Sequence, residues 1–409
     1  MHTVFVIIFW SSFASLCFSY FGYPLLVLLA SRLNPKKRQR QVDPADEDLP
    51  QVTVLIAAHN AEHHIGERIA NILACDYPQD RLNIVVASDG STDATVQVVK
   101  RFDQAHIEAI AFPQRRGKSM TLVDAVRQLH SEVLVFTDAS SRFDRDSVRQ
   151  LARHFVDPQV GIVAGKVAIV DEQGVPSESL YWRTEMMVRQ SEAQLGIMLG
   201  ASGAIYAIRR RLFVEPARSV INDDLVFPLL SHLRHGGEFI FDETAKAYAL
   251  STGGLAGEFR RRCRIGAGAY QCLPVLRELL QWPHAKQAVA FCSHKLLRWI
   301  CPFLLVALIA TNLALLSFPG YRLFFSMQVA AYLLAVFGLI APGRGHVARV
   351  ARIAAAFLVM NIALLMGFFR WVFNPRNVVW VPTGRSVKQL RPFYESCSKR
   401  VSAEQRVTD

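Results

Sequence analysis

The stretch "LNIVVASDGSTDATVQVVKRF", residues 82–102, contains the signals of a strand, a turn and a helix in succession. Residues 82–88 form an apolar run of strand length, and the second half of the stretch carries apolar residues at helical spacing. Gly90 marks the turn between them, and Ser91 or Thr92 is expected to cap the helix. The stretch therefore predicts a strand that ends at polar residues and leads directly into a helix.

This alternation of strand and helix continues along the chain. An apolar run at 52–58 precedes apolar residues at helical spacing in 65–73. Further strands are expected near 107–111 and 133–137, with a helix near 119–129 between them. The alternation predicts an α/β fold with a mostly parallel, Rossmann-like sheet, which binds ligands at the carboxyl ends of its strands. The polar residues expected at those ends are Asn60, Asp89 and Asp138.

The composition indicates that one chain combines a membrane part and a soluble part. Of the 409 residues, 51% are hydrophobic, which is high for a soluble protein, whereas the middle of the chain is too charged for a purely membrane protein. Four apolar stretches, at 4–29, 299–318, 323–341 and 353–373, approach or exceed the roughly 20 residues of a membrane span. The first has neither a basic start nor a cleavage site, so it is expected to be a retained anchor instead of a signal peptide.

The net charge of +12 is concentrated beside the apolar stretches. A basic cluster at 36–40 follows the first stretch and arginines lie between the third and fourth, so the positive-inside rule predicts that these segments and the soluble domain are cytoplasmic. The basic tail at 374–409 does not fit four full crossings, so one C-terminal stretch is expected to be re-entrant or interfacial. Because no nucleic-acid motif accompanies the charge, anionic lipids and phosphate ligands are expected and nucleic acid is not. The basic residues concerned are Lys36, Lys37, Arg38, Arg40, Arg344, Arg349 and Arg352.

These features divide the chain into several expected parts. They are an N-terminal anchor at 1–33, a soluble domain at 51–250, an interfacial arginine-rich segment at 251–298, about three membrane helices at 299–373 and the tail at 374–409. The 7 cysteines are scattered without metal-binding spacing, which predicts reduced thiols that bind no metal.

Two strings in the soluble domain suggest contacts with a nucleotide. In "ASDGSTD", 87–93, the Asp89 carboxylate can face the polar edge of a nucleoside, although a strand-to-helix turn with a capping acid explains the string equally well. In "RRGKS", 115–119, the basic turn can face a phosphate or can be a solvated loop, and both interpretations stay open. The string is not a P-loop, because Phe112 stands where that motif needs a glycine.

Three further strings place charged or small residues at the ends of expected elements. "INDDLVF", 221–227, puts Asp223 and Asp224 at the start of an apolar helix, where an ionised carboxylate can act as a general base; for an isolated pair, two acids that cap the helix are the simpler interpretation. The small residues of "GASGAIYAIRR", 200–210, allow a ligand to approach the backbone, but tight packing explains them more simply. The arginines of "EFRRRCRIGAG", 258–268, can hold a pyrophosphate, and lipid headgroups are the simpler alternative.

Taken in order, the strings "AAHNAE", "SDGSTD", "GK", "FTDAS", "GASGA" and "NDD", followed by an arginine-rich segment and apolar stretches, resemble the membrane-embedded family 2 glycosyltransferases. That group includes the synthases of cellulose, hyaluronan and poly-N-acetylglucosamine. The resemblance covers about residues 52–271 closely and the flanking stretches by layout. It implies a GT-A fold that binds a nucleotide sugar, most often a UDP-sugar, together with Mg²⁺ or Mn²⁺.

The resemblance also implies roles for individual residues. Asp224 corresponds to the catalytic base, with Asp223 beside it, and would take the proton from an acceptor hydroxyl in a single inverting displacement. Asp138 and Ser140 correspond to the metal motif. The remaining correspondences are Ala58, Asn60, Asp89, Lys118 and Asp138 for the nucleotide sugar, Gly200, Ser202 and Gly203 for the acceptor, and Arg261 and Arg264 for the diphosphate.

The chain departs from the family pattern at two places. Ser140 replaces the second acid of the metal motif, so Asp138 is expected to hold the cation while the diphosphate supplies most other ligands, and metal affinity should be low without nucleotide. At 261–265 the arginine of the family's glutamine-x-x-arginine-tryptophan signature remains as Arg264, but Ile265 replaces the tryptophan. This second departure places processive synthesis in doubt.

Three functions stay open from the sequence. The first is an inverting synthase that elongates a polysaccharide, the second is an enzyme that adds one sugar to a lipid-linked acceptor, and the third is a noncatalytic membrane scaffold with a decayed fold. The joint presence of Asp89, Lys118, Asp138 and Asp224 disfavours the third. The expected partners are a nucleotide sugar, a polysaccharide or lipid-linked acceptor, membrane lipids and the proteins of an export system, and the resemblance implies a bacterial inner membrane with a cytoplasmic catalytic domain.

Overall fold

The computed structural model describes two compact units. A sheet unit contains Val27–Gly253 and Cys272–Gln287, and a helical unit contains Met1–Leu26, Gly254–Gln271 and most of Ala288–Val378. The described residues are 1–33, 43–171, 173, 175, 180–251, 255–340 and 345–373. The basic cluster at 36–40 and Arg344, which supported the predicted topology, and the tail at 374–409, which did not fit four full crossings, lie outside these residues.

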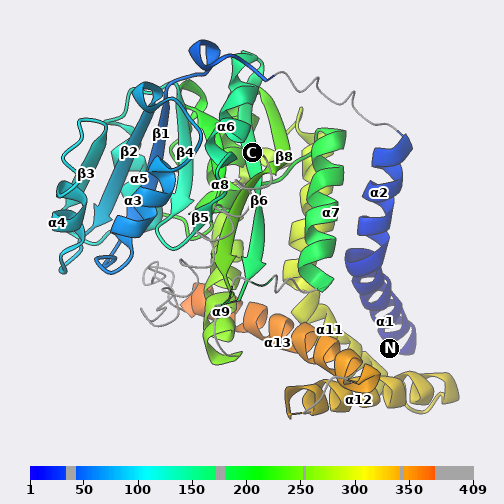
Figure 1. Ribbon diagram of the computed structural model, residues 1–409. Coiled ribbons are helices and arrows are strands. Elements are labelled where there is room, and N and C mark those ends of the chain that lie inside the picture. Colours follow the sequence, from blue (N-terminus) through cyan, green and yellow to red (C-terminus); the bar gives the residue numbers. More distant parts are fainter. Residues whose placement is uncertain are drawn as a thin grey trace. The chain divides into compact units, whose positions relative to one another are not determined.

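The first half of the sheet unit is the parallel sheet that the sequence predicts. Strands β1 (Val52–Ala58), β2 (Leu82–Asp89), β3 (Ile107–Phe112) and β4 (Val133–Asp138) are joined by parallel pairing in the order β3-β2-β1-β4 (Figure 1). Every residue of β1 is buried. A central parallel strand is covered on both faces, which explains its uninterrupted apolar sequence.

The second half of the sheet is mixed, and the sequence did not predict most of its strands. It contains β7 (Tyr206–Arg209), β6 (Val160–Val170), β8 (Glu238–Leu250) and the short β5 (Arg142–Phe143), in that order after β4. β7 is antiparallel to both β4 and β6, whereas β8 is parallel to β6. The complete sheet is therefore mixed and mostly parallel.

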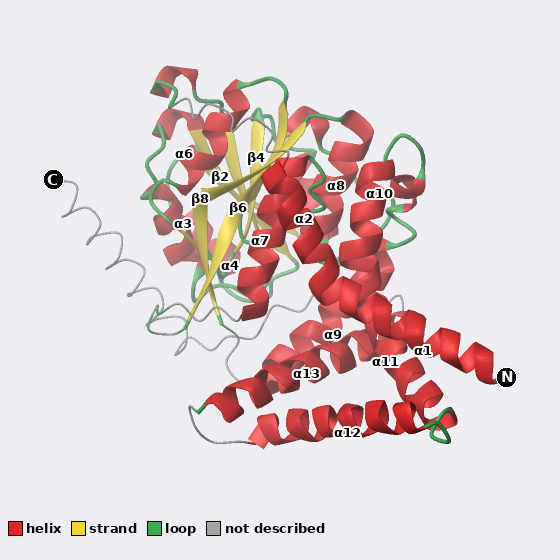
Figure 2. Cartoon of the chain, turned by 90° about the vertical axis from the view of Figure 1, so that its right-hand side faces the viewer, coloured by secondary structure: helices red, strands yellow, loops and turns green. Residues whose placement is uncertain are grey.

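Helices cover both faces of this sheet. Figure 2 shows α3 and α6 on one side and α8 on the other. On the first side, isoleucines of α3 pack in one buried cluster with residues of α6 and of the central strands. On the second side, the Phe136 ring of β4 stacks on Tyr206 of β7 with 4.9 Å between ring centroids and meets Phe227 of α8 edge to face. The helices of this unit are α3 (Ile65–Leu73), α4 (Thr95–Lys100), α5 (Lys118–Val126), α6 (Ser147–Ala152), α7 (Leu180–Leu195) and α8 (Asp223–His235).

The predicted capping of α4 is wrong. The helix begins at Thr95, and the Asp93 carboxylate, instead of Ser91 or Thr92, accepts the Thr95 N–H at 3.0 Å. Ser91 and Thr92 are engaged elsewhere, because Ser91 Oγ accepts the Asn60 N–H and the Thr92 N–H donates to Asn60 Oδ1. The tertiary contact between two loops therefore takes the hydroxyl that the local pattern assigned to the helix.

The helical unit contains the apolar stretches of the sequence. Four helical spans, His2–Leu33, Ala285–Ala314, Pro319–Ile340 and His346–Phe373, are long and apolar enough to cross a membrane by length and composition. They overlap the four stretches expected from the sequence. The elements are α1 (His2–Cys17), the π-helical Phe18–Gly22, α2 (Tyr23–Leu33), α9 (Leu255–Cys272), α10 (Ala285–Phe291), the π-helical Cys292–Leu296, α11 (Leu297–Ala314), α12 (Pro319–Ile340) and α13 (His346–Phe373). Of these, residues 27–33 of α2, the last residue of α9 and residues 285–287 of α10 are counted in the sheet unit.

Small residues let helices of this unit approach closely. A Cβ added to Gly338 of α12 would clash with the Ala351 carbonyl oxygen of α13. A Cβ on Gly367 of α13 would stand 2.6 Å from the Ala267 nitrogen of α9. Such backbone contacts are typical of helices that associate within a bilayer.

We predict that Gly165→Ala destabilises the sheet unit. Gly165 lies at the register shift between β6 and β8, where an added Cβ would stand 2.6 Å from the Ala245 carbonyl oxygen. Since backbone must move to relieve this clash, the free energy of unfolding should fall by about 1–3 kcal/mol, measured by urea unfolding in detergent. Gly257→Ala on α9 is the control for an added methyl group without a clash, because no atom lies within 4 Å of its added Cβ. Since alanine favours a helix more than glycine does, this change should not lower stability.

Candidate active site

The loop after β1 is fixed to the loop after β2. Asn60 adopts a positive φ of 50°, and its Oδ1 accepts the Thr92 N–H at 2.9 Å. The Ala61 N–H donates to Thr95 Oγ1 at 2.7 Å, and His59 Nδ1 lies 2.7 Å from the Asp89 carbonyl oxygen. The structure therefore brings the predicted Asn60 to the carboxyl ends of both strands, directly beyond the buried Ala58 that ends β1.

Asp89 holds the basic turn that precedes α5. Its carboxylate is fully buried and accepts the Arg116 N–H at 2.7 Å and the Gly117 N–H at 2.9 Å. Gly90 has a φ of 60°, and an added Cβ there would stand 2.7 Å from the Arg115 nitrogen. The turn is therefore packed tightly against the end of β2, while the contact of Asp89 with a base or ribose stays a prediction.

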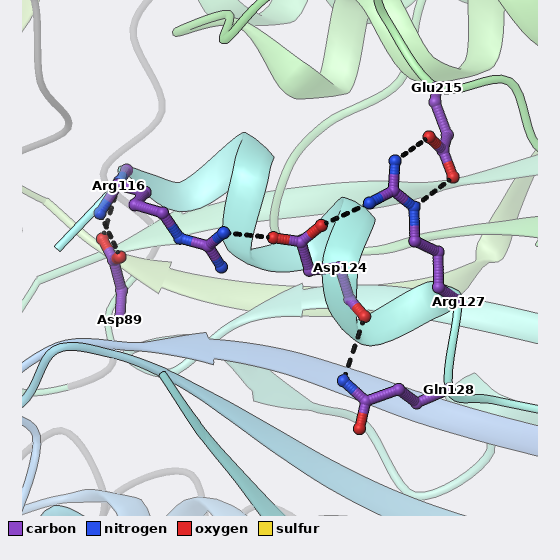
Figure 3. A network of polar contacts seen from close by, with 7 residues as sticks. Asp89, Arg116, Asp124, Arg127, Gln128 and Glu215 are labelled. Carbon is purple, nitrogen blue, oxygen red and sulfur yellow. Dashed lines mark hydrogen bonds and ion pairs between the residues drawn. The ribbon is translucent and has the colours of Figure 1, made fainter. Parts of the chain in front are cut away.

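A chain of ion pairs anchors α5 on its outer side. Figure 3 shows Arg116 facing Asp124, which also faces Arg127, and Arg127 in turn facing Glu215. Arg116 Nη1 lies 2.6 Å from Asp124 Oδ2, Arg127 Nη1 lies 2.9 Å from Asp124 Oδ1, and Arg127 Nε donates to Glu215 Oε1 at 2.9 Å. These contacts tie the basic turn and α5 to the loop between β7 and α8.

Lys118 is buried between two carboxylates at the start of α5. Its Nζ lies 2.9 Å from Asp138 Oδ1 and 3.1 Å from Asp223 Oδ2. Burial alone lowers the pKa of Lys118, but the charges of Asp138 and Asp223 outweigh it and hold the pKa above the ordinary value. The charged ammonium form is therefore favoured, and it joins α5, β4 and α8.

Asp223 and Asp224 occupy different environments although they are neighbours. Burial raises the pKa of Asp223 from 3.8 to about 6, with Lys118 acting in the opposite direction and Asp224 adding to the rise. Asp224 Oδ2 accepts the Gly203 N–H at 3.0 Å, and the Asp224 carbonyl oxygen accepts the Ala201 N–H at 2.8 Å. The second acid is thus oriented by the backbone of the 200–205 segment, which we call the small-residue turn.

Gly203 marks the point on which three charged side chains converge. A Cβ added there would stand 3.4 Å from Lys118 Nζ, 3.6 Å from Asp224 Oδ2 and 3.7 Å from Asp138 Oδ2. Gly200 likewise lies against α8, because its added Cβ would be 3.2 Å from the Leu225 Cα. The small residues therefore pack tightly, as the simpler interpretation of the sequence expects, and the approach of a ligand to their backbone stays a prediction.

The residues of the expected metal motif supply few ligands by themselves. The Asp138 side chain at the end of β4 is 40% exposed, and Ser140 is half-buried two residues later. Among the described residues, no group of three or more His, Cys, Asp or Glu side chains could hold a metal ion. Carboxylate and hydroxyl oxygens suit Mg²⁺ or Mn²⁺, so these two residues fit such a cation only as part of a site that a bound ligand completes.

Two residues at this site were not found from the sequence. Arg189 of α7 donates from Nη1 to Ser202 Oγ at 2.6 Å. Tyr206 is fully buried, and no partner of its hydroxyl is found in the described parts of the chain; burial, followed by the charges of Asp223 and Asp224, raises its pKa well above the ordinary value. Arg189 lies outside the strings singled out in the sequence, and Tyr206 lies in the apolar part of "GASGAIYAIRR", where nothing marks it as a site residue.

The predicted diphosphate arginines belong to the helical unit. Arg261 and Arg264 both lie on α9. Arg261 donates from Nε and Nη2 to Glu258 one turn earlier, at 3.0 Å each. Their contact with a diphosphate stays a prediction.

Comparison with known proteins gives matches over this region. Residues 50–268, more than half of the chain, match the family described as "Glycosyltransferase like family 2". The chain is 22% identical over 235 residues to poly-beta-1,6-N-acetyl-D-glucosamine synthase from Staphylococcus aureus, covering 56% of each chain. It is 28% identical over 127 residues to beta-monoglucosyldiacylglycerol synthase from Synechocystis, covering 30% of this chain and 26% of that protein. The chain thus spans about half the length, or less, of the curated relatives that it matches.

A solved structure shows the same fold over most of the chain. The mannosyltransferase from Pyrobaculum calidifontis, solved in complex with GDP-Man and Mn²⁺, superposes with a TM-score of 0.64 at 20% identity. The superposition covers 90% of this chain and 99% of that one. At this identity the likeness concerns the arrangement of the elements only.

We predict that Asp223 makes stability depend on pH. Because its folded-state pKa of about 6 exceeds the ordinary 3.8, the folded protein binds a proton more tightly than the unfolded chain, and stability falls as pH rises from about 4 through about 6. Asp223→Asn removes this loss. The free energy of unfolding of the variant minus that of the wild type should therefore increase by about 1–3 kcal/mol as pH rises over that range, since one pKa unit corresponds to about 1.4 kcal/mol.

Urea unfolding in detergent at a series of pH values measures this difference. Asp80→Asn, on an exposed residue of the same unit, is the control and should follow the wild-type pH profile. Parallel curves for the wild type and Asp223→Asn would contradict the prediction.

Proposed function

This chain belongs to glycosyltransferase family 2 and has the GT-A fold, and we propose on that premise that it is an inverting enzyme that transfers a sugar from a nucleotide sugar to a growing polysaccharide. The observation that carries the proposal is the convergence of Lys118, Asp138 and Asp224 on the bare backbone at Gly203. Lys118 can then stabilise a leaving group, Asp138 can bind a metal ion and Asp224 can act as a base, all beside the small-residue turn. A decayed scaffold would not need this arrangement.

Asp224 is the proposed general base. The Gly203 N–H fixes one oxygen of its carboxylate, and the residue lies in the first turn of α8. The carboxylate takes the proton from an acceptor hydroxyl as that oxygen attacks the anomeric carbon. The bond to the nucleotide diphosphate breaks in the same displacement, so configuration inverts and no covalent enzyme intermediate forms.

Lys118 is the proposed cation for the leaving diphosphate. Its charge is already desolvated and held in place by Asp138 and Asp223, so little reorganisation is needed when negative charge develops on the leaving oxygen. Asp138 and Ser140 would hold a Mg²⁺ or Mn²⁺ ion. When bound, that ion would neutralise further charge on the diphosphate. The mannosyltransferase with the same fold was solved with Mn²⁺, which supports this assignment.

The donor is proposed to be a UDP-sugar held by the loops after β1 and β2. Asn60 and Asp89 lie at the carboxyl ends of adjacent parallel strands, where such sheets bind nucleotides. The Asp89 carboxylate accepts two backbone N–H groups of the Arg115–Lys118 turn, so this turn lies beside the end of β2. A base and ribose bound near Asp89 would therefore place the diphosphate near Lys118. Arg261 and Arg264 of α9 are proposed to contact the same diphosphate.

The acceptor is proposed to be a polysaccharide, with a lipid-linked acceptor as the alternative. The polysaccharide proposal follows the relative named poly-beta-1,6-N-acetyl-D-glucosamine synthase. Ile265, which replaces the tryptophan of processive synthases, favours the transfer of one sugar instead, and another relative is named as a synthase of a glycosyl diacylglycerol. We place the enzyme in a bacterial inner membrane with its catalytic domain cytoplasmic, in contact with membrane lipids and the proteins of an export system.

Product size distinguishes the two acceptors. Purified protein in nanodiscs is incubated with Mg²⁺ or Mn²⁺, native lipids and each member of a panel of radiolabelled nucleotide sugars. We expect a long polymer from one UDP-sugar. One added sugar that extracts with lipid would replace the polysaccharide proposal with the alternative, and neither transfer nor nucleotide binding with any donor would contradict the enzyme assignment.

We predict that Asp224→Asn abolishes transfer but keeps nucleotide binding. The amide preserves the shape and the acceptor for the Gly203 N–H but cannot take a proton, so kcat should fall by at least about 100-fold. Calorimetric titration with UDP should give an affinity like that of the wild type. Asp80→Asn should keep full turnover, whereas full turnover in Asp224→Asn would remove Asp224 from the role of base.

We predict that Ser140→Asp strengthens the metal dependence. A second carboxylate would add a charged oxygen ligand beside Asp138, so the half-saturating Mn²⁺ concentration for transfer should fall several-fold. Titration of activity with Mn²⁺ after removal of metal by chelation measures this change. An unchanged Mn²⁺ titration would exclude position 140 from the metal site.

A further inference from the structure

The small-residue turn is held by contacts from several elements. The Ala201 and Gly203 N–H groups donate to Asp224 of α8, at 2.8 and 3.0 Å. The Thr137 hydroxyl of β4 donates to the Ala204 carbonyl oxygen at 2.7 Å. The remaining polar side chain of the turn, Ser202, is 7% exposed. The Ile205 N–H closes the turn by donating to the Ser202 carbonyl oxygen at 3.0 Å, and the Ser202 side chain adds a contact from outside the turn.

Arg189 provides the contact at Ser202. Its Nη1 donates to Ser202 Oγ at 2.6 Å from α7, and its side chain is only 15% exposed. Its Nε lies 3.8 Å from Glu185 Oε1, whose side chain is 6% exposed and lies one turn earlier on the same helix. The guanidinium is thus held by a buried carboxylate before it reaches the turn, and its charge strengthens the hydrogen bond.

The geometry connects this contact to the base by a short path. Ser202 and Gly203 share a planar peptide unit, and the N–H of that unit is the group that donates to Asp224 Oδ2. A change in the backbone ψ angle of Ser202 therefore turns the Gly203 N–H, which is the donor that orients the Asp224 carboxylate. The same peptide lies beside the point on which Lys118 and Asp138 converge.

We propose that Arg189 is a positioning residue, which fixes Ser202 and thereby the Gly203 N–H that orients Asp224. This inference rests on the proposed function, because it takes Asp224 as the base. Arg189 acts through the turn and makes no contact with substrate. Its loss should therefore affect the chemical step more than the binding of the donor.

The test is a double-mutant cycle in the full-length protein in nanodiscs. Arg189→Ala and Ser202→Ala should each lower kcat by about 10- to 100-fold, since a small misplacement of a reacting group costs up to about that factor. The KM for the nucleotide sugar should change by less than about twofold, because the proposal leaves donor contacts intact. The double variant should be no slower than Arg189→Ala, because both changes break the same contact.

Arg183→Ala is the matched control. Arg183 is an exposed arginine on the same helix, and within the described part of the chain no hydrogen bond or ion pair links it to the turn, so this variant should keep wild-type kinetics. Arg189→Lys keeps the charge but loses the fork of donors, so it should restore only part of kcat. Wild-type UDP binding in each variant establishes that the sheet unit is folded.

Several outcomes would overturn the proposal. Additive losses in the double variant would show that Arg189 and Ser202 act separately, and a raised KM with unchanged kcat would show that Arg189 binds the donor directly. Wild-type kinetics in Arg189→Ala, together with an inactive Asp224→Asn, would reject the positioning role of Arg189 but keep Asp224 as the base. Full turnover in Asp224→Asn would instead reject the proposed base, which separates the two failures.

Discussion

The buried ammonium of Lys118 between Asp138 and Asp223 is the interaction on which the site depends. It joins the first residue of α5, the last residue of β4 and the first residue of α8, which come from distant parts of the chain. Without the cation, carboxylates gathered near Gly203 would repel one another in a region of low dielectric. The positive charge therefore allows the acids to be brought together at all.

This arrangement favours function over stability. Buried ion pairs recover only part of the cost of desolvation, and the raised pKa of Asp223 shows that its negative charge is not fully compensated. The buried Tyr206 hydroxyl adds a further polar group at the same place. Costs of this kind are common at active sites, where preorganised charge lowers the reorganisation that a reaction needs.

Hydrogen bonds hold the two backbone segments that lie beside these charged residues. On one side, Asp89 fixes the basic turn by accepting two of its backbone N–H groups, and Lys118 follows that turn as the first residue of α5. On the other, α8 and α7 fix the small-residue turn through Asp224 and Arg189. A leaving group and an acceptor would thus meet between two segments whose backbones have little freedom.

The sequence alone predicted the parallel strands and the apolar spans, because strand and helix periods are local properties. It placed Asp89, Asp138 and Asp224 at element ends, where the structure has them. Only the fold brings Lys118 to Asp138 and Asp223, and Arg189 to Ser202. The fold also engages Ser91 and Thr92 with Asn60, so neither caps α4. These contacts join residues far apart in the chain or compete with local alternatives, and strand order and side-chain packing fix them, which no local pattern encodes.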